Sequence, residues 1–570
     1  MRRALVGAVV IASAAIAAAF ARGPLAARGA AANVAVPNPA SRPNGQTAVS
    51  ARSRAATPGS IGAKADEPAA AASGDQGPKL ENLAAYIPAQ CYAKTKRADG
   101  TPRNACATCH QASREPNYVD DSDVQLEISI PRFAATNRWT NAMTPPPAVA
   151  IGERELLAYV RTDNYRGGEA VTATASYAPD CHFMPDEQGW DRDASGTATG
   201  WRSYASTPVP GMFWPTNGSA GDAYIRLPEP YRRDAGGAPS EGIYALNLAI
   251  LEAMIRRADV PITATAEATL GVDLDGDGKL GVARRVAFVW PPAKDRPLHF
   301  VGQAAALDRA TAGWPAAGLY PTGTEVLHSV RYLDVAGGRV RPAARMKELR
   351  YMKKLRWLTY SALDLQAKTE QREKEQNPDT LRHVYGNGER GVGTGTGWQM
   401  LGYIEDAAGT LRAQTTEETA ACIGCHGGVG ATTDSTFSFA RKVAWTAPPR
   451  FMALAEPLRA DGRGEYRTWL EAVGAGDDFG SNAEVAAKFF AKDGSLRPAM
   501  AKALARDISV LVVPSPRRAL ALDRAYLALV RMQSFELGRD AFAGAPQIEA
   551  TLVQDAATGI TSALPPAWQR

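Results

Sequence analysis

Cysteine and histidine are scarce in this sequence of 570 residues, which contains six of each. So few cysteines exclude a small scaffold held together by dense disulfides, and a hydrophobic content of 45% supports an ordinary buried core instead. A formal net charge of only +5, with no nucleic-acid-binding motif, gives no argument for a nucleic-acid partner. No run of 18 apolar residues follows residue 21, so we expect no membrane span in the mature chain.

The N-terminus has the pattern of an export signal. Arg2 and Arg3 precede an apolar stretch at residues 4–20, and Ala19-Phe20-Ala21 fits the rule for signal-peptide cleavage. We therefore predict a signal peptide at residues 1–21 and a periplasmic or secreted protein. The alternative is a retained N-terminal anchor, for which the apolar stretch has the shortest workable length. No cysteine follows this stretch, which argues against a lipid anchor.

The rest of the chain divides into four expected regions. Residues 22–78 are rich in Ala, Pro, Gly and Ser, so they bury too little apolar surface to fold and are predicted to be a disordered linker. Three further regions follow, at residues 79–240, 241–380 and 381–570. Oligomeric state is not indicated by any pattern.

Several segments have recognisable periodicity. Residues 241–257 predict a helix, residues 285–290 and 325–333 predict strands, and residues 447–570 are expected to be mostly helical, with segments near 462–474 and 516–537. Residues 343–371 predict the longest helix, with a basic cluster made of Arg345, Lys347, Arg350, Lys353, Lys354 and Arg356. This cluster is a solvated helix face, a docking face for an acidic redox partner, or a set of arginines that pair with haem propionates. The Gly-rich segment at 386–397 lacks the ending of a phosphate loop.

Two copies of the pattern C-x-x-C-H carry the clearest chemistry. They are Cys106-Ala-Thr-Cys109-His110 and Cys422-Ile-Gly-Cys425-His426. Two thiols at this spacing reach the two vinyl groups of one porphyrin, and the following histidine becomes the proximal iron ligand. The pattern therefore predicts two covalently bound haems, with His110 and His426 on the irons. The alternative is a four-cysteine zinc site built from both pairs.

The remaining cysteines and histidines supply candidates for the opposite face of each iron. Cys91 and Cys181 would form a disulfide in an oxidising compartment, which would bring His182 and Met184 near the first haem. His328, in a strand-like segment, is the favoured distal ligand, ahead of His182. The less favoured candidates are His299, His383, Met143, Met212 and Met400.

A separate motif points to calcium. Asp273, Asp275 and Asp277 occupy positions 1, 3 and 5 of an EF-hand-like loop, with Gly278 at position 6. Position 12 is Arg284 instead of the bidentate glutamate, so calcium affinity should be weak unless a remote carboxylate replaces it. The alternative is a surface turn without an ion.

At these motifs the chain resembles bacterial dihaem c-type cytochromes. Its layout is similar to a group of uncharacterised exported cytochrome c proteins, through the segments Gln90-Cys91-Tyr92, Phe213-Trp-Pro-Thr-Asn-Gly218 and Ala421-Cys-Ile-Gly-Cys-His-Gly-Gly428. A more remote resemblance is to dihaem peroxidases and rubber oxygenases. The resemblance implies haem at the six motif residues. The expected fold is α+β, mainly helical and loop-rich around two haems, with short strands.

The expected function is electron transfer through the two haems to a redox partner protein. The alternative is a haem enzyme of the peroxidase or oxygenase kind, in which one haem is five-coordinate. A third reading makes most of the chain an interaction scaffold that uses the basic segment at 343–371.

Overall fold

A computed structural model describes most of residues 137–542 and short pieces between residues 82 and 134. The pieces are residue 82 and residues 84–92, 95–96, 102–103 and 134; the gaps after residue 137 are 170, 172–175, 209–217, 291–297, 308–314, 378, 381–382, 388, 428–431, 440, 444–453, 460–461 and 475–481. The predicted signal peptide, the predicted linker and the first C-x-x-C-H motif lie outside the described residues. All described residues belong to one compact unit, Gly77–Arg570.

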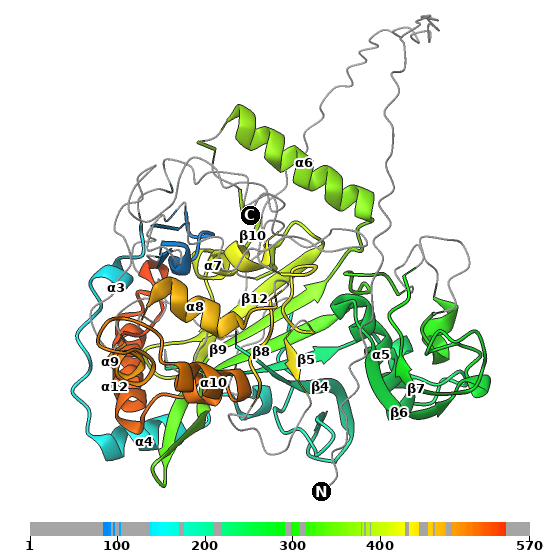
Figure 1. The fold of residues 1–570 in the computed structure, drawn as a ribbon, viewed down its shortest axis with the longest axis horizontal. Coiled ribbons are helices and arrows are strands. Elements are labelled where there is room, and N and C mark those ends of the chain that lie inside the picture. The colour runs from blue at the N-terminus through cyan, green and yellow to red at the C-terminus, as the bar shows by residue number, and fades with distance from the viewer. Residues whose placement is uncertain are drawn as a thin grey trace, which may run out of the picture. The chain divides into compact units, whose positions relative to one another are not determined.

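The described part of the chain is built on a ten-stranded sheet (Figure 1). Its central order is β10-β11-β12-β9-β8-β5-β4-β14, with β13 beside β12 and β3 beside β4, and every pairing is antiparallel. These strands are β3 (Trp190–Arg192), β4 (Ala198–Ser206), β5 (Ala220–Arg226), β8 (Glu325–Ala336), β9 (Arg339–Lys354), β10 (Gly386–Asn387), β11 (Gly391–Gly393), β12 (Trp398–Glu405), β13 (Leu411–Ala413) and β14 (Lys442–Val443). Strands from all three expected regions therefore join one sheet.

The helices and the remaining strands surround this sheet. The α-helices are α3 (Thr140–Met143), α4 (Glu153–Arg161), α5 (Glu241–Arg256), α6 (Tyr360–Gln376), α7 (Thr416–His426), α8 (Glu465–Val473), α9 (Ala483–Phe489), α10 (Pro498–Arg506), α11 (Ser509–Val512) and α12 (Pro516–Met532). The 3-10 turns are η1 (Ala89–Tyr92), η3 (Arg166–Gly168), η5 (Glu229–Arg232), η6 (Glu267–Thr269), η7 (Gly302–Ala306) and η9 (Phe535–Leu537). Two separate hairpins pair β1 (Thr95–Lys96) with β2 (Pro102–Arg103), and β6 (Val260–Ala266) with β7 (Val282–Val286).

The expected fold class is wrong, because a large antiparallel sheet and not a set of helices forms the centre of the molecule. One face of this sheet packs against α4 and α12 through Tyr332 and Ile404. The opposite face carries an aromatic cluster that includes Trp201, Tyr224 and Tyr351. Both faces of the central strands are therefore buried.

The prediction of a helix over residues 343–371 is also wrong for the first half of that segment. Residues 339–354 form β9, and a helix begins only at Tyr360. This segment is rich in residues that favour helices, but it is hydrogen-bonded to β8 on one side and to β12 on the other. Of the basic cluster, Arg345, Lys347 and Lys354 are buried, so neither the solvated helix face nor the alternative, a continuous docking face, forms.

The other periodicity predictions agree better with the structure. The helix at 241–257 is α5, and the strand at 325–333 is the first part of β8. The expected strand at 285–290 overlaps only the end of β7. In the C-terminal region the described helices α8 and α12 match the two expected segments.

A buried carboxylate, Glu405 at the end of β12, joins several of these elements. It accepts hydrogen bonds from Tyr159 Oη of α4 and Tyr332 Oη of β8, both at 2.6 Å, and forms an ion pair with Arg345 of β9. Gln533, after α12, donates to the Glu405 backbone oxygen at 3.0 Å. Burial raises the pKa of Glu405, and the partial compensation comes from Arg345. All its side-chain partners are needed to offset the loss of hydration.

We therefore predict that Glu405→Gln lowers the free energy of unfolding by about 3–5 kcal/mol, because it leaves Arg345 as an uncompensated buried charge. Urea denaturation followed by circular dichroism measures this change. The control is Glu471→Gln, which removes exposed ion pairs with Arg463 and Arg467 and should cost less than about 1 kcal/mol. Equal losses in the two variants would contradict the role given to Glu405.

Candidate functional site

The second C-x-x-C-H motif forms the last two turns of α7. This helix begins with a capping box, in which the Thr415 side chain accepts from the Glu418 backbone N–H and the Glu418 side chain accepts from the Thr415 backbone N–H. Arg412 binds both oxygens of the Glu418 carboxylate, at 2.9 and 2.8 Å. The capping box and Arg412 fix the first turn of α7. The helix then sets the positions of the motif residues at its C-terminal end.

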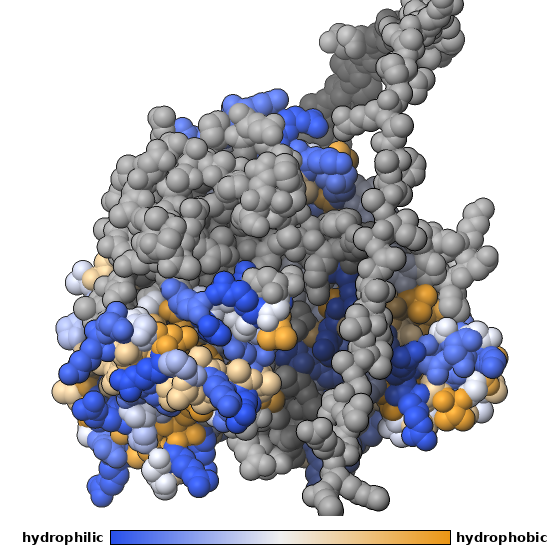
Figure 2. Space-filling model, viewed as in Figure 1, coloured by the Kyte–Doolittle hydropathy of each residue, from blue (hydrophilic) through white to orange (hydrophobic). Residues whose placement is uncertain are grey.

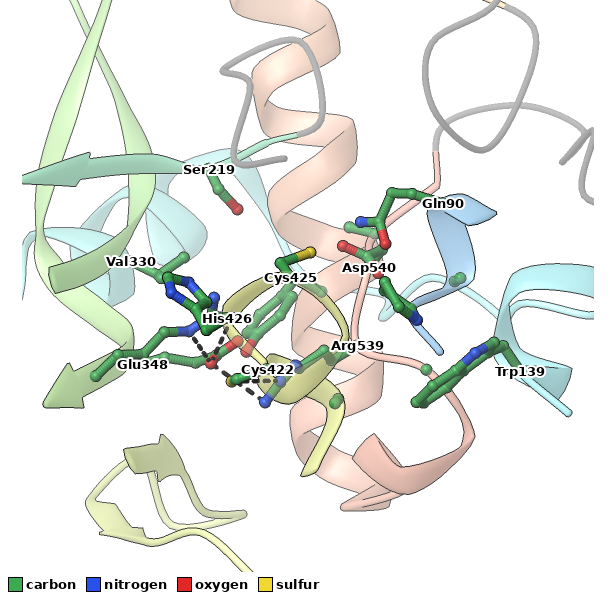
Figure 3. Close-up of a pocket in the computed structure, with 17 residues that line it drawn as sticks. Gln90, Trp139, Ser219, Val330, Glu348, Cys422, Cys425, His426, Arg539 and Asp540 are labelled. Atoms are coloured by element: carbon green, nitrogen blue, oxygen red, sulfur yellow. Dashed lines mark hydrogen bonds and ion pairs between the residues drawn. The ribbon is translucent and has the colours of Figure 1, made fainter. Parts of the chain in front are cut away.

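The motif residues line a cavity of about 70 Å³ between α7, the sheet and the C-terminal segment (Figure 3). Cys422, Cys425 and His426 come from α7, Val330 and Glu348 come from β8 and β9, and Arg539 and Asp540 follow η9; Pro88, Ala89, Gln90, Trp139, Ser219, Arg350, Ala421, Tyr526, Gly538 and Ala541 complete the lining. In Figure 3 the Cys422 side chain points toward Arg539, whereas Cys425 points away from it. The two sulfurs therefore do not converge on one small ion.

His426 is held in one tautomer. Its Nδ1 lies 2.7 Å from the Ser435 backbone oxygen, and because a carbonyl only accepts, Nδ1 carries the proton. Burial, and to a smaller extent charge on Arg350, lower the pKa of His426 to about 4, so the ring is neutral at pH 7. Its Nε2 is then a lone-pair nitrogen, which is the form in which histidine binds metals.

Charged groups also line the cavity, and of these only Arg350 belongs to the basic cluster noted in the sequence. Arg539 donates to Cys422 Sγ at 3.5 Å and lies 3.3 Å from the Glu348 carboxylate. Glu348 pairs with Arg350 at 2.8 Å as well. Burial raises the pKa of Asp540 to about 6. Arg539 and Asp540 lie far from the motif in sequence, and only the packing of the segment after η9 against α7 brings them to it.

His328 lies on the face of the sheet that α7 covers. It pairs with Arg350 across β8 and β9, and its Nδ1 is 3.0 Å from the Asp222 backbone oxygen. Burial, followed by charge on Arg350 and His426, lowers the pKa of His328 to about 4. His328, the favoured distal ligand, therefore lies close enough to His426 for their charges to interact.

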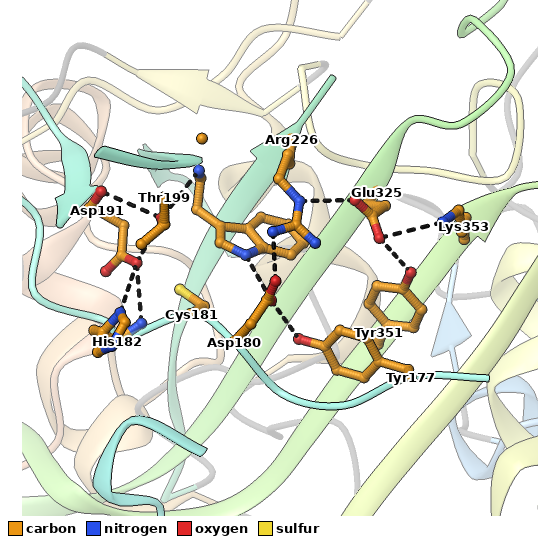
Figure 4. A network of polar contacts seen from close by, with 12 residues as sticks. Tyr177, Asp180, Cys181, His182, Asp191, Thr199, Arg226, Glu325, Tyr351 and Lys353 are labelled. Carbon is orange, nitrogen blue, oxygen red and sulfur yellow. Dashed lines mark hydrogen bonds and ion pairs between the residues drawn. The ribbon is translucent and has the colours of Figure 1, made fainter. Parts of the chain in front are cut away.

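The other distal candidates are placed elsewhere. Cys181 is a buried free thiol, so the predicted disulfide with Cys91 is absent. Without it, His182 contacts Asp191 at 3.5 Å, as Figure 4 shows, and Met184 is 73% exposed. Neither residue lines the cavity beside α7.

The less favoured candidates do not line this cavity either, in the described part of the chain. His299 lies with Nδ1 2.9 Å from the Phe300 oxygen, His383 is exposed, and Met400 is buried in β12. Met143 is partly buried in α3. Met212, and the motif residues Cys106, Cys109 and His110, lie outside the described residues.

The predicted calcium loop connects η6 to β7. Asp273 and Asp275 lie together with Glu267, and ligand oxygens of the three carboxylates are within 4.8 Å of one another. Glu267 is the remote carboxylate that the motif lacked: it precedes the loop and is only 1% exposed. Asp277 is not part of this group, and its carboxylate accepts from the Lys279 N–H at 2.8 Å.

Backbone N–H groups orient these carboxylates. Asp273 accepts from Gly276 and Gly278 at 2.7 and 2.8 Å, and Glu267 accepts from Leu274 and Gly281 at 2.6 and 2.8 Å. Gly276 and Gly278 have φ values of +71° and +80°, which other residues rarely adopt. Glu267 Oε1 also accepts from the Asp275 N–H at 3.3 Å, but both Asp273 oxygens and Glu267 Oε2 accept only one of these bonds each. These three oxygens keep a second acceptor position, so the loop can bind a hard cation without changing its backbone.

Comparisons with known proteins assign the chain to a family. A family model described as a lipoprotein matches residues 77–448, more than half of the chain, so the protein belongs to this lipoprotein family. An uncharacterized lipoprotein of Aquifex aeolicus (strain VF5) is 29% identical over 542 residues, which cover 81% of this chain and 86% of the relative. No solved structure matches.

This membership corrects the resemblance to dihaem cytochromes and to dihaem peroxidases. The family shown is a lipoprotein family and not a cytochrome c family. The electron-carrier function and the haem-enzyme alternative, which both followed from that resemblance, are therefore wrong, and the redox partner has no support. What the six motif residues bind is a separate question that neither comparison tests, so it stays a prediction.

Membership of a lipoprotein family indicates an exported, membrane-anchored protein. It thus corrects the argument against a lipid anchor, which rested on the lack of a cysteine after the apolar stretch. Among the described residues, no helix combines the length and the apolar character that a bilayer crossing requires.

Gly424, inside the motif, provides a test of the packing around α7. A Cβ at this position would lie 2.1 Å from the Tyr86 oxygen and 2.2 Å from Pro88 Cδ. Gly424→Ala should therefore lower the free energy of unfolding by about 1–3 kcal/mol through overpacking, although alanine ordinarily stabilises a helix. The matched control is Gly242→Ala in α5, where the nearest atom is Ser240 Oγ at 3.9 Å. Chemical denaturation should show a lower free energy of unfolding for Gly424→Ala and a higher one for Gly242→Ala. An increase in both variants would contradict the close packing of Gly424 against Tyr86 and Pro88.

Proposed function

We propose that this lipoprotein is an exported calcium-binding protein, in which Ca²⁺ holds the loop between η6 and β7 in place. The observation that carries the proposal is the group of three carboxylates formed by Glu267, Asp273 and Asp275. Ca²⁺ prefers six to eight oxygen ligands, including bidentate carboxylates. Glu267 supplies the carboxylate that Arg284 fails to provide at position 12.

The position of the loop explains what the ion would stabilise. β6 and β7 form a two-stranded hairpin, which has few hydrogen-bonded neighbours of its own. Leu274, inside the loop, is buried in the core cluster around α5 together with Val272 and Ala283. Bound Ca²⁺ would offset two of the three negative charges of these carboxylates and keep Leu274 in this cluster.

The predicted location fits this proposal. Extracellular calcium is abundant enough to occupy sites with Kd values near the millimolar range. We propose that residues 1–21 direct export and that the protein acts in the periplasm or outside the cell. Since the site has only one strongly buried carboxylate, weak binding is expected.

We predict that Ca²⁺ stabilises the protein against heating. A free Ca²⁺ concentration of ten times Kd adds about 1.4 kcal/mol to the free energy of unfolding. With an unfolding entropy of about 2.1 cal/mol/K per residue, this raises Tm by about 1–2 °C in a protein of this size. Differential scanning calorimetry of the full-length protein, with Ca²⁺, with Mg²⁺ and with EDTA, measures the shift. Glu267→Gln and Asp273→Asn should remove it, while circular dichroism confirms that both variants are folded.

The control is Asp193→Asn, in an exposed turn where Asp193 accepts from the N–H groups of Ser195 and Thr197. This variant should keep the full Ca²⁺ response. The proposal fails if Ca²⁺ and EDTA give the same Tm for the natural protein, or if the Glu267 variant responds as the natural protein does.

A second candidate function is cofactor binding at the C-x-x-C-H motif that ends α7. The neutral His426 favours it, because its Nε2 carries a lone pair that can bind iron. The thiols of Cys422 and Cys425 point in different directions, as attachment to two separate vinyl groups requires. The haem predicted from the motif would use thioether bonds from Cys422 and Cys425 and an iron bond from His426. This proposal concerns the bound group alone and assigns it no electron-transfer role.

A pyridine haemochrome assay tests this candidate, with the full-length protein produced in a host that attaches c-type haem. The motifs predict two haems per chain, and Cys422→Ser together with Cys425→Ser should remove one of them. Cys181→Ser, which changes a buried thiol outside the motifs, should remove none. A natural protein without haem would exclude the cofactor.

A further inference from the structure

A second cavity, unrelated to both proposed sites, lies where β9 ends and β10, β11 and β12 begin. Its volume is about 440 Å³, within the range of small-molecule sites. We propose that this cavity binds an acidic sugar, meaning a sugar-sized molecule with hydroxyl groups and one carboxylate or phosphate group. The proposal goes beyond calcium or cofactor binding and does not depend on either.

The charge of the lining points to an anion. Arg356 and Arg390 line the cavity, and no aspartate or glutamate does so. Neither guanidinium makes an ion pair with another described residue, and both side chains are exposed. Arginine binds carboxylate and phosphate groups through paired N–H donors. Two arginines in a lining without a carboxylate therefore favour an oxyanion, although the exposed Glu389 precedes Arg390 in the chain.

The uncharged lining is suited to a hydroxylated ring. Tyr385 is 78% exposed at the cavity, so one ring face is open to stack on a sugar. Asn387 and Gln399 supply amide groups. The Asn387 Oδ1 accepts from the N–H groups of Glu389 and Arg390, at 3.1 and 2.7 Å, which leaves its amide N–H donors for a ligand.

Four of the five glycines of the lining divide into two kinds. Gly386, Gly391 and Gly397 are required by the fold, because a Cβ at each would lie 2.1–2.3 Å from a backbone oxygen. Gly393 differs: a Cβ there would meet only the Tyr385 oxygen, at 3.8 Å, an ordinary contact. Chain packing does not require glycine at this exposed position of β11, so the missing side chain serves to keep the cavity open.

Isothermal titration calorimetry of the full-length protein tests the proposal with four probes. They are glucuronate, glucose 6-phosphate, neutral glucose and inorganic phosphate. At least one acidic sugar should bind saturably and at least tenfold more tightly than glucose and inorganic phosphate. Rising NaCl should weaken this binding, since the arginines are exposed.

Three variants locate the binding in the cavity. Arg356→Gln and Arg390→Gln should each weaken it at least tenfold, and Gly393→Val should block it, with no change in Tm. The matched control is Arg339→Gln, which removes an exposed arginine at the other end of β9 and should leave affinity unchanged.

Each other outcome overturns the proposal. Absence of saturable binding by both acidic sugars would do so, as would equal binding of glucose. Inorganic phosphate binding as tightly as glucose 6-phosphate, with no binding of glucuronate, would exclude a sugar site. Unchanged affinity in both arginine variants would place the binding elsewhere.

Discussion

The buried carboxylate of Glu405 is the interaction on which the arrangement of the sheet and its covering helices depends. It brings Tyr159 of α4, Tyr332 of β8 and Arg345 of β9 to one point, and Gln533 ties the end of α12 to the same residue. A charge in this environment is tolerated only when its hydrogen-bonding positions are filled. The requirement restricts how α4 and α12 can lie on β8, β9 and β12.

A β-bulge adds a second constraint. Val330 pairs with Glu348 and Arg331 pairs with Met346, so Lys347 is the extra residue of β9. The bulge reverses the alternation of side chains along the strand. It leaves Met346 and Leu349 on the aromatic face and turns Glu348 and Arg350 toward α7, where both line the cavity that contains His426. The chemistry of that cavity therefore depends on a single inserted residue.

The two proposed ligand sites and the cofactor candidate occupy different parts of one unit. The calcium loop belongs to the β6–β7 hairpin, where Leu280 and Val282 are exposed and Figure 2 shows hydrophobic surface. The acidic-sugar cavity lies at the β9–β12 end of the sheet. Both proposed sites, for calcium and for an acidic sugar, are consistent with an exported, anchored lipoprotein that binds ligands at its surface. Because the sites share no residue, each proposal can fail without affecting the other.

Local patterns in the sequence determined local structure and the identity of the chemistry-bearing motifs. The apolar spacing of residues 241–257 determined α5, and the Asp-x-Asp spacing determined a turn whose carboxylates are oriented by their own backbone, because these interactions join residues close in the chain. The C-x-x-C-H spacing likewise determined that Cys422, Cys425 and His426 lie together.

Only the tertiary structure decided the rest, because the deciding contacts join residues far apart in sequence. Residues 343–354 contain Arg, Lys, Met, Glu and Leu, which favour a helix locally, yet pairing with β8 and β12 makes them a strand. Arg539 of the C-terminal segment reaches Cys422 Sγ across 117 residues of sequence. The spacing of neighbouring residues cannot predict such contacts, because they form only when the sheet brings distant segments together.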